Sequence, residues 1–223
     1  LGKVGGVLKD EELRLYVGLF VGAVALIMWN LKGFYGSLGE TVRHAAFQVS
    51  SIMTTTGFAT TDFDLWPSFS KGILLMLMVV GACAGSTGGG VKVSRFVIVV
   101  KATAAEFRRL LHPRSVKVTT MDGKPIGKET IQGVQSYLMI YFLITILSML
   151  LVSLDNFDLV TTITAVEATL NNIGPGLNLV GPTGNYSLFS PLSKIVLTLD
   201  MLLGRLELFP MLILMMPSTW RKN

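Results

Sequence analysis

The sequence Thr54-Thr55-Thr56-Gly57-Phe58 joins a short apolar segment to a polar, acidic loop. A glycine after small hydroxyl residues permits φ values that a Cβ forbids, so the backbone can run extended through such a stretch. Its main-chain carbonyls can then point inward and replace the water shell of a dehydrated cation. A turn between two helices is the alternative interpretation, because threonine and glycine are common in turns. The surrounding sequence decides between an ion filter and a turn.

The composition is typical of a membrane protein. Hydrophobic residues make up 51% of the chain and charged residues 15%, and the mean hydropathy is +0.60. Soluble domains carry about 25% charged residues. A net charge of +5 would fit a nucleic-acid partner, but the basic residues gather in one stretch between apolar segments, which positive-inside topology explains better. We therefore expect no nucleic-acid partner.

The single cysteine, Cys83, excludes a disulfide framework and a cysteine metal cluster. No cleavable signal peptide is visible at the start of the sequence. Because the sequence starts at Leu1 rather than at a methionine, we expect it to be part of a longer protein.

The first part of the chain predicts a membrane span, a shorter helix and a second span with a break in it. Residues 13–31 carry one charge at their edge, and they cover about 28 Å at 1.5 Å per residue, enough to cross a bilayer. Residues 38–53 are too short and too polar to face lipid. We predict that they form a pore helix ending in a filter at 54–58, since non-helical backbone at this depth must be buried or line a wet cavity. Residues 72–100 are apolar apart from a glycine-rich stretch at 85–90.

This break has the sequence Gly85-Ser86-Thr87-Gly88-Gly89-Gly90. Each glycine in a helix costs roughly 1 kcal/mol relative to alanine, so such a stretch cannot remain ordinary helix. It lacks the Gly-Lys-Ser/Thr ending of a phosphate-binding loop. Its position inside an apolar segment places the break near the middle of the membrane. Because four glycines exceed what a packing kink requires, we favour a gate over a kink.

Residues 115–130 predict a cytoplasmic linker that contains a small hairpin. Lysine and arginine are concentrated between Lys92 and Lys128, which assigns this side of the chain to the cytoplasm. Asp122-Gly123 is a strong turn signal for a hairpin.

The pattern of span, short helix and glycine motif starts again after the linker. Residues 131–154 carry no charge and form a predicted span, and residues 159–170 form a second predicted pore helix. That helix leads into a predicted filter at 171–176, with the sequence Asn171-Asn172-Ile173-Gly174-Pro175-Gly176. Residues 193–216 form the predicted last span.

Arg205 is a charge inside this last predicted span. On insertion scales it costs roughly 2.5–3.5 kcal/mol, and such residues usually face a cavity or a partner. An internal pair with Glu207 or Asp200 is the alternative, but residues two apart point to different helix faces and residues five apart are not ideally placed either. We therefore favour a role at the pore, where a guanidinium raises the energy of a passing cation and can hold carbonyls of the glycine-rich break.

The spacing of glycines indicates that residues 131–223 repeat residues 1–114. Gly57 and Gly174 are 117 residues apart, and Gly85 and Gly204 are 119 apart. Internal repeats of this kind are how many transport proteins are built. The predicted fold class is an all-α polytopic membrane protein made of repeated span–pore helix–filter–span units. Two unrelated helical hairpins are the alternative.

Together these motifs resemble the Trk/Ktr/HKT superfamily of potassium transporters, and most closely its bacterial membrane subunits. The two filters, the glycine-rich break and Gly204-Arg205-Leu206-Glu207 carry the resemblance. It implies four repeats around a pseudo-fourfold pore, of which these two look like the third and fourth, so a missing N-terminal half would supply the first two. It also implies a multi-pass protein of the bacterial inner membrane that takes up potassium and is not an enzyme.

The resemblance further implies site residues and partners. Potassium would be held by the carbonyls around each filter glycine, namely Thr55, Thr56, Gly57, Asn172, Ile173 and Gly174. Asn172 departs from the family pattern, which has a threonine at this position. The gate would comprise Gly85, Ser86, Thr87, Gly88, Gly89, Gly90 and Arg205. The expected partners are a second copy, in a homodimer, and a cytoplasmic nucleotide-binding regulatory ring of the TrkA type on the basic side.

Two other functions stay open on the residues alone. A secondary transporter with broken helices would bind another solute at the same glycines. An intramembrane serine protease would use Ser86 as nucleophile and His44 as base, which requires a hydrogen bond between the two side chains. The predicted depths of these residues differ, which disfavours the protease.

Overall fold

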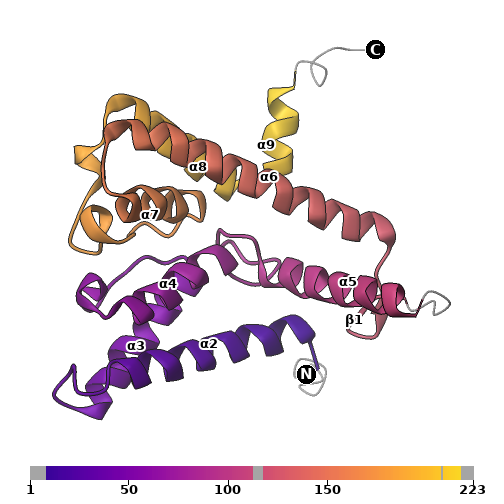
Figure 1. The fold of residues 1–223 in the computed structure, drawn as a ribbon, viewed down its shortest axis with the longest axis horizontal. Coiled ribbons are helices and arrows are strands. Elements are labelled where there is room, and N and C mark those ends of the chain that lie inside the picture. Colours follow the sequence, from indigo (N-terminus) through magenta and orange to yellow (C-terminus); the bar gives the residue numbers. More distant parts are fainter. Residues whose placement is uncertain (1–8, 113–117, 207, 217–223) are drawn as a thin grey trace.

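A computed structural model describes residues 9–112, 118–206 and 208–216. Within these residues the regular secondary structure is helical apart from one short hairpin (Figure 1). The α-helices are α2 (Glu11–Asn30), α3 (Leu38–Met53), α4 (Ser68–Val80), α5 (Val93–Leu111), α6 (Lys128–Val152), α7 (Leu159–Leu170), α8 (Pro191–Arg205) and α9 (Leu208–Met215). Four 3-10 turns, η1 (Phe63–Leu65), η2 (Ser153–Asp155), η3 (Asn178–Val180) and η4 (Tyr186–Leu188), and two strands, β1 (Thr120–Met121) and β2 (Lys124–Pro125), complete the fold.

The helices form two groups that meet at α4 and α7. Helices α2, α3 and α4 pack together, α6, α7 and α8 pack together, and α5 runs from the end of α4 past α2 toward the start of α6 (Figure 1). The first group buries a core that includes Ile27, Val49 and Leu74, and Ile173 from the second group joins that core. Because the second filter motif packs into the first group, the two groups share one centre.

Helices α3 and α7 have the bounds predicted for the two pore helices, 38–53 and 159–170. Ser37 begins α3 by accepting a hydrogen bond from the Glu40 N–H at 3.1 Å, and Asp158 begins α7 by accepting from the Thr161 N–H at 3.0 Å. Side-chain oxygens at this position satisfy N–H groups that have no partner within the helix. The Thr161 hydroxyl also donates to Asp158, and this bond holds the pKa of the Asp158 carboxyl below its ordinary value.

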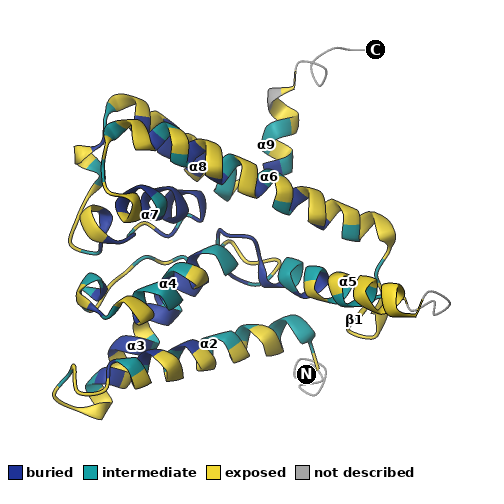
Figure 2. Cartoon of the chain, in the orientation of Figure 1, coloured by how far each residue is buried: buried dark blue, intermediate teal, exposed yellow. Residues whose placement is uncertain are grey.

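Helix α7 is the most enclosed element of the fold. Nine of its residues, from Thr161 to Leu170, are buried, and it appears as the dark element between α4 and α8 (Figure 2). A helix of twelve residues, which carries Glu167 and several threonines among apolar residues, is therefore surrounded by other helices.

The break in the second span is longer than predicted. Helix α4 begins at Ser68 rather than at residue 72 and ends at Val80, and α5 begins at Val93 and continues to Leu111, past residue 100. The non-helical segment is thus 81–92 instead of 85–90. The reason is Gly81, which has φ +70° and ends α4 four residues before the first glycine of the predicted break.

The predicted last span at 193–216 is two helices, and the expectation of one continuous span is wrong. Helix α8 ends at Arg205, and α9 leaves it at a steep angle from Leu208 (Figure 1). Pro210 explains the break, because a proline ring clashes with the carbonyl four residues earlier, here Leu206, but is tolerated in the first turn of a helix. Residue 207, one alternative partner for Arg205, lies outside the described residues.

The hairpin predicted in the linker is confirmed for its described part. Strands β1 and β2 pair antiparallel with Thr120 opposite Pro125 and Met121 opposite Lys124. Asp122 and Gly123 have φ values of +50° and +75°, and two positive φ values are what a tight two-residue hairpin turn requires. Residues 113–117 of the linker region lie outside the described residues.

Helices α2 and α6 are long and apolar enough to cross a membrane. The exposed side of α6 carries large apolar side chains, whereas Thr145 and Ser148 are buried on its inner side. This distribution is the reverse of a helix on the surface of a water-soluble domain. The exposed set on α6 is Met139, Phe142, Leu143, Ile146, Leu147 and Leu150.

Candidate functional site

Both filter motifs begin where a short helix ends, and their N–H groups bond back to that helix in one pattern. In the first motif the N–H groups of Thr54, Thr55, Thr56 and Gly57 donate to the carbonyls of Ser50, Ile52, Ser51 and Ser51 at 2.9, 3.1, 2.8 and 3.4 Å. In the second, those of Asn171, Asn172, Ile173 and Gly174 donate to Glu167, Thr169, Ala168 and Ala168 at 3.0, 3.0, 2.8 and 3.3 Å. Every donor and every acceptor is displaced by 117 residues, the spacing of Gly57 and Gly174. The two motifs therefore have the same backbone conformation.

Asparagine at position 172, where the family pattern has a threonine, has a conformational reason. Thr55 and Asn172 occupy equivalent positions, and both have left-handed backbones, with φ values of +55° and +54°. Asparagine is enriched severalfold in this region among residues other than glycine, so it suits the position better than threonine does. Its amide also donates to the Met201 carbonyl of α8 at 3.0 Å, which ties the second motif to the last helix pair.

The two motifs lie side by side. Gly57 has φ +77°, and a Cβ at this position would lie 2.0 Å from the carbonyl oxygen of Ile173. Gly174 has φ +108° but faces open space, and its carbonyl accepts a bond from the Tyr186 hydroxyl at 2.7 Å. The structure thus brings the first predicted filter, Thr55 to Gly57, next to the second, Asn172 to Gly174.

The segment 81–92 is a loop with a closed neck. The N–H groups of Val91, Lys92 and Val93 donate to the carbonyls of Val79, Val80 and Ala82 at 3.1–3.2 Å. These backbone hydrogen bonds hold the two ends of the loop together. The chain crosses itself at the neck, because a Cβ on Gly90 would lie only 2.7 Å from the Gly81 Cα. Both glycines are needed for this approach, and the loop projects from the neck as a single unit.

The tip of this loop contacts the ends of both pore helices. The Gly89 N–H donates to the Thr55 hydroxyl at 3.3 Å, and a Cβ on Gly89 would lie 2.1 Å from the Asn171 carbonyl oxygen. Residues 88 and 89 therefore sit directly beneath the start of the two filter motifs. Residues 84–87 of the loop are exposed in this chain.

Two cations hold the loop through its carbonyls. Arg205 Nη1 donates to the Thr87 carbonyl at 2.6 Å, and Lys92 Nζ donates to the carbonyls of Gly88 at 2.5 Å and Ser86 at 3.0 Å. The contact between Arg205 and the glycine-rich break was predicted, and it is present. A cavity of about 160 Å³ under the loop is lined by both cations and by Arg95.

Lys92 was not among the predicted site residues. In the sequence it reads as the first residue of the basic stretch 92–128, yet its side chain is buried and its backbone has φ +78°. Its position in the sequence could have indicated a role at the site, because Lys92 follows the glycines of the break closely and is flanked by valines.

Asp200 is the alternative partner of Arg205 that lies within the described residues, and its hydrogen bond is made elsewhere. Asp200 is buried and accepts a hydrogen bond from the Ser148 hydroxyl at 2.7 Å. The alignment of Gly85 with Gly204, in contrast, is wrong in detail. Gly85 lies in the exposed part of the loop, whereas Gly204 lies in helix α8, where a Cβ would be 1.7 Å from the Leu170 carbonyl oxygen.

A buried polar network behind the second motif was also missed from the sequence. The Asn171 amide donates to the Glu167 carboxylate at 2.9 Å, and the Tyr141 hydroxyl lies 3.0 Å from Asn171 and 3.2 Å from Glu167. All three side chains are buried. The network fixes the residue at which α7 turns into the second filter, and it depends on Tyr141 of α6, far away in sequence.

Ser86 and His44 bond to other partners. The Ser86 hydroxyl donates to the Cys83 carbonyl at 2.6 Å, and His44 Nδ1 contacts the Thr60 hydroxyl at 3.0 Å while its ring stacks on Tyr35. The two side chains therefore do not form the nucleophile–base pair that the disfavoured protease alternative requires. Among the described residues no group of three or more His, Cys, Asp and Glu side chains could hold a metal ion.

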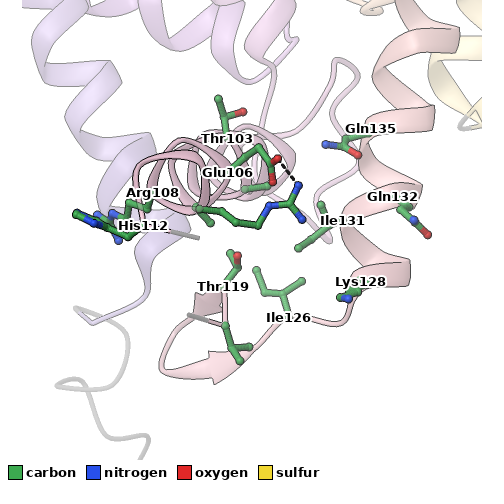
Figure 3. A pocket seen from close by; sticks show the side chains of 14 residues that line it. Thr103, Glu106, Arg108, His112, Thr119, Ile126, Lys128, Ile131, Gln132 and Gln135 are labelled. Carbon is green, nitrogen blue, oxygen red and sulfur yellow. Dashed lines mark hydrogen bonds and ion pairs between the residues drawn. The ribbon is translucent and has the colours of Figure 1, made fainter. Parts of the chain in front are cut away.

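A second, larger cavity lies at the basic end of the chain. It has a volume of about 730 Å³ and lies between α5, the hairpin and the start of α6 (Figure 3). Arg108, His112 and Lys128 contribute basic groups, and Glu106 pairs with Arg109 at 2.6 Å. Basic residues of the stretch 92–128 thus line an open cavity at the opposite end of α5 from the filter motifs.

A family model described as TrkH, cation transport protein, matches residues 35–222. The chain belongs to the TrkH family. The potassium uptake protein TrkH of Escherichia coli K12 is 36% identical over 217 residues, and TrkI of Halomonas elongata is 31% identical over 218. Each match covers 96% of this chain and 44% of the relative, so the chain spans less than half the length of these relatives.

A solved structure agrees with this assignment. The crystal structure of the potassium transporter TrkH from Vibrio parahaemolyticus superposes with a TM-score of 0.87 at 37% identity. The match covers 96% of this chain and 46% of that chain. The helical architecture is therefore that of a TrkH protein over nearly the whole chain.

Gly204 provides a test of the packing at the end of α7. Gly204→Ala should destabilise the protein by roughly 1–3 kcal/mol, the usual cost of overpacking, because the new Cβ would clash with the Leu170 carbonyl oxygen. Gly133→Ala is the matched control, since Gly133 lies in α6 and a Cβ there meets nothing within 4 Å. Thermal unfolding of the full-length protein in detergent would measure both. Equal midpoints for the two variants would contradict the close approach.

Proposed function

We propose that this chain forms the third and fourth repeats of a potassium uptake protein of the bacterial inner membrane. Residues 1–114 and 131–223 are the repeats, and 115–130 is the cytoplasmic linker between them. The observation that carries the proposal is the identical hydrogen-bond pattern of the two filter motifs, displaced by 117 residues throughout. Two unrelated hairpins have no reason to end their short helices in one backbone conformation.

In the proposed filter, potassium is the transported ion and main-chain carbonyls replace its water shell. The contributing residues are Thr55, Thr56 and Gly57 from one repeat and Asn172, Ile173 and Gly174 from the other. The close approach of Gly57 to Ile173 supports the proposal that the two motifs form adjacent quarters of one ring. Carbonyls around a narrow pore select ions by the number and field strength of their dipoles.

A complete pore needs two more quarters. Unpaired carbonyls cannot face lipid, so half a filter requires further protein around it. The relatives are about twice as long as this chain, which is the length expected for four repeats. The apolar exposed side of α6, with its polar residues buried, supports lipid on the outside of the proposed pseudo-fourfold ring.

The proposed gate is the loop 81–92. Its tip lies beneath both filter motifs, where it would obstruct an ion leaving the filter, and Arg205 and Lys92 hold it by its carbonyls. A positive charge at this depth also raises the energy of a passing cation. Charge-assisted hydrogen bonds contribute roughly 1.5–3 kcal/mol each, so a partner that supplies a few kcal/mol can release the loop.

The proposed partners are a second copy of the protein and a cytoplasmic nucleotide-binding ring of the TrkA type. The ring would dock on the basic side, where the exposed Arg108 lies on α5. Such docking would move α5, which begins at the loop.

Substitution of Gly57 and Gly174 tests the proposed filter. Gly57→Ser should weaken the preference for rubidium over sodium, because the side chain strains a backbone at φ +77° and clashes with Ile173. Gly174→Ser should have a smaller effect of the same sign, since it introduces strain without a clash. Permeability ratios measured on the full-length protein in liposomes would decide. Wild-type ratios in both variants would exclude these glycines from the filter.

The gate is tested by flux without the regulatory partner. Arg205→Ala, Lys92→Ala and deletion of Gly85–Gly90 should each raise partner-independent rubidium flux, because each removes the obstruction or what holds it. Arg109→Ala is the matched control, since this arginine pairs with Glu106 away from the loop. Unchanged flux in all three variants, with normal insertion, would rule out the gate. Uptake of another solute without rubidium flux would instead favour a secondary transporter.

A further inference from the structure

Glu12, in the first turn of α2, contacts the loop 81–92 from outside the elements that carry the filter. Its Oε1 accepts hydrogen bonds from the N–H groups of Ala84 at 2.6 Å and Ser94 at 3.0 Å. Ala84 belongs to the loop, and Ser94 is in the first turn of α5. One carboxylate oxygen therefore joins the ascending part of the loop to the helix that leaves it.

Glu12 supplies the capping acceptor that the residues just before α5 do not provide. Lys92 precedes α5 without forming a side-chain cap, so the first N–H groups of that helix need acceptors from elsewhere. The N-terminus of a helix also carries a partial positive charge, which a carboxylate stabilises. Glu12 thus caps α5 from a different helix, and the resulting bonds are charge-assisted.

The same turn of α2 is bound to the cytoplasmic hairpin. Asp122, in the hairpin turn, accepts a hydrogen bond from the Glu11 N–H at 2.8 Å. Glu11 pairs with Lys101 of α5, and Lys101 donates to the Thr120 carbonyl of β1 at 2.8 Å. The hairpin, α5 and the start of α2 therefore form one connected unit. Glu12 is the residue of this unit that contacts the loop 81–92.

We propose that Glu12 is a positioning residue of the gate, and that the first turn of α2 links the position of the hairpin to the loop. The inference rests on the proposed function of the loop as an obstruction. Arg205 and Lys92 hold carbonyls at the tip of the loop, whereas Glu12 holds an N–H group nearer its start. A movement of the hairpin shifts Glu11 and Glu12 together, and with them the N–H groups of Ala84 and Ser94.

Cys83 gives a direct readout of this restraint. It is the only cysteine in this chain, it is half-buried, and it precedes Ala84. In the full-length protein, with any other cysteine replaced by serine, we would measure the rate at which a maleimide modifies Cys83. Glu12→Ala removes the acceptor, Glu12→Asp keeps the charge but shortens the reach, and Glu12→Gln keeps the acceptor without the charge.

Modification should accelerate roughly tenfold in Glu12→Ala, equivalent to about 1.4 kcal/mol, and should also accelerate in Glu12→Asp. Glu12→Gln should accelerate modification less than Glu12→Ala does, because an amide oxygen at the same position still accepts both bonds but lacks the charge that strengthens them. Glu106→Ala, which removes a carboxylate from α5 far from the loop, should not differ from wild type. Equal rates in all variants, or a glutamine variant as fast as the alanine variant, would overturn the inference.

Rubidium flux on the same proteins separates this inference from the proposed gate. If both hold, Glu12→Ala raises partner-independent flux together with Cys83 modification. Faster modification with unchanged flux would mean that Glu12 positions the loop but that the loop does not obstruct the pore. In that case the proposed gate fails while the positioning role stands.

Discussion

The structure depends on a close approach between two backbones, that of the loop 81–92 and those at the ends of the two pore helices. At Gly89 a Cβ would lie 2.1 Å from the Asn171 carbonyl oxygen, and at Gly57 it would lie 2.0 Å from that of Ile173. Side chains are excluded from both contacts, so the loop meets the second filter motif, and the two filter motifs meet each other, through main-chain groups. Gly57 and Gly89 are therefore explained by contact as much as by flexibility, and the loop can approach the second filter motif this closely only because Gly89 has no side chain.

The second requirement is positive charge beside the loop. Lys92, at the end of the loop, and Arg205, at the end of α8, each donate hydrogen bonds to its carbonyls. Carbonyl acceptors offset the cost of burying Lys92, and both cations in turn keep the loop in one position. In the proposed gate, the closed state is a set of hydrogen bonds that a regulatory partner would exchange for others. The contacts that stabilise the loop would then be the same contacts that resist cation passage.

The sequence predicts those parts of the fold that are specified locally. The bounds of α3 and α7 follow from capping residues and apolar pattern, the hairpin from Asp122-Gly123, and the contact of Arg205 with the loop from a charge that needs a partner. The break between α8 and α9 is also specified locally, by Pro210. The sequence analysis missed it because residues 208–216 are otherwise apolar and continue the predicted span. What could not be predicted depends on contacts between distant residues: Lys92 and Glu12 on the loop, Gly204 against Leu170, and Tyr141 behind the second filter.

A reversible cross-link between loop and filter tests the central claim most directly. A Cβ on Gly88 would lie 3.3 Å from the Thr55 hydroxyl oxygen, so Thr55→Cys with Gly88→Cys, in a Cys83→Ser background, places two thiols within reach of a disulfide. Rubidium flux of the activated full-length protein should stop on oxidation and return on reduction, whereas each single-cysteine variant should be insensitive to both. A disulfide verified by mass spectrometry that leaves flux unchanged would contradict the account.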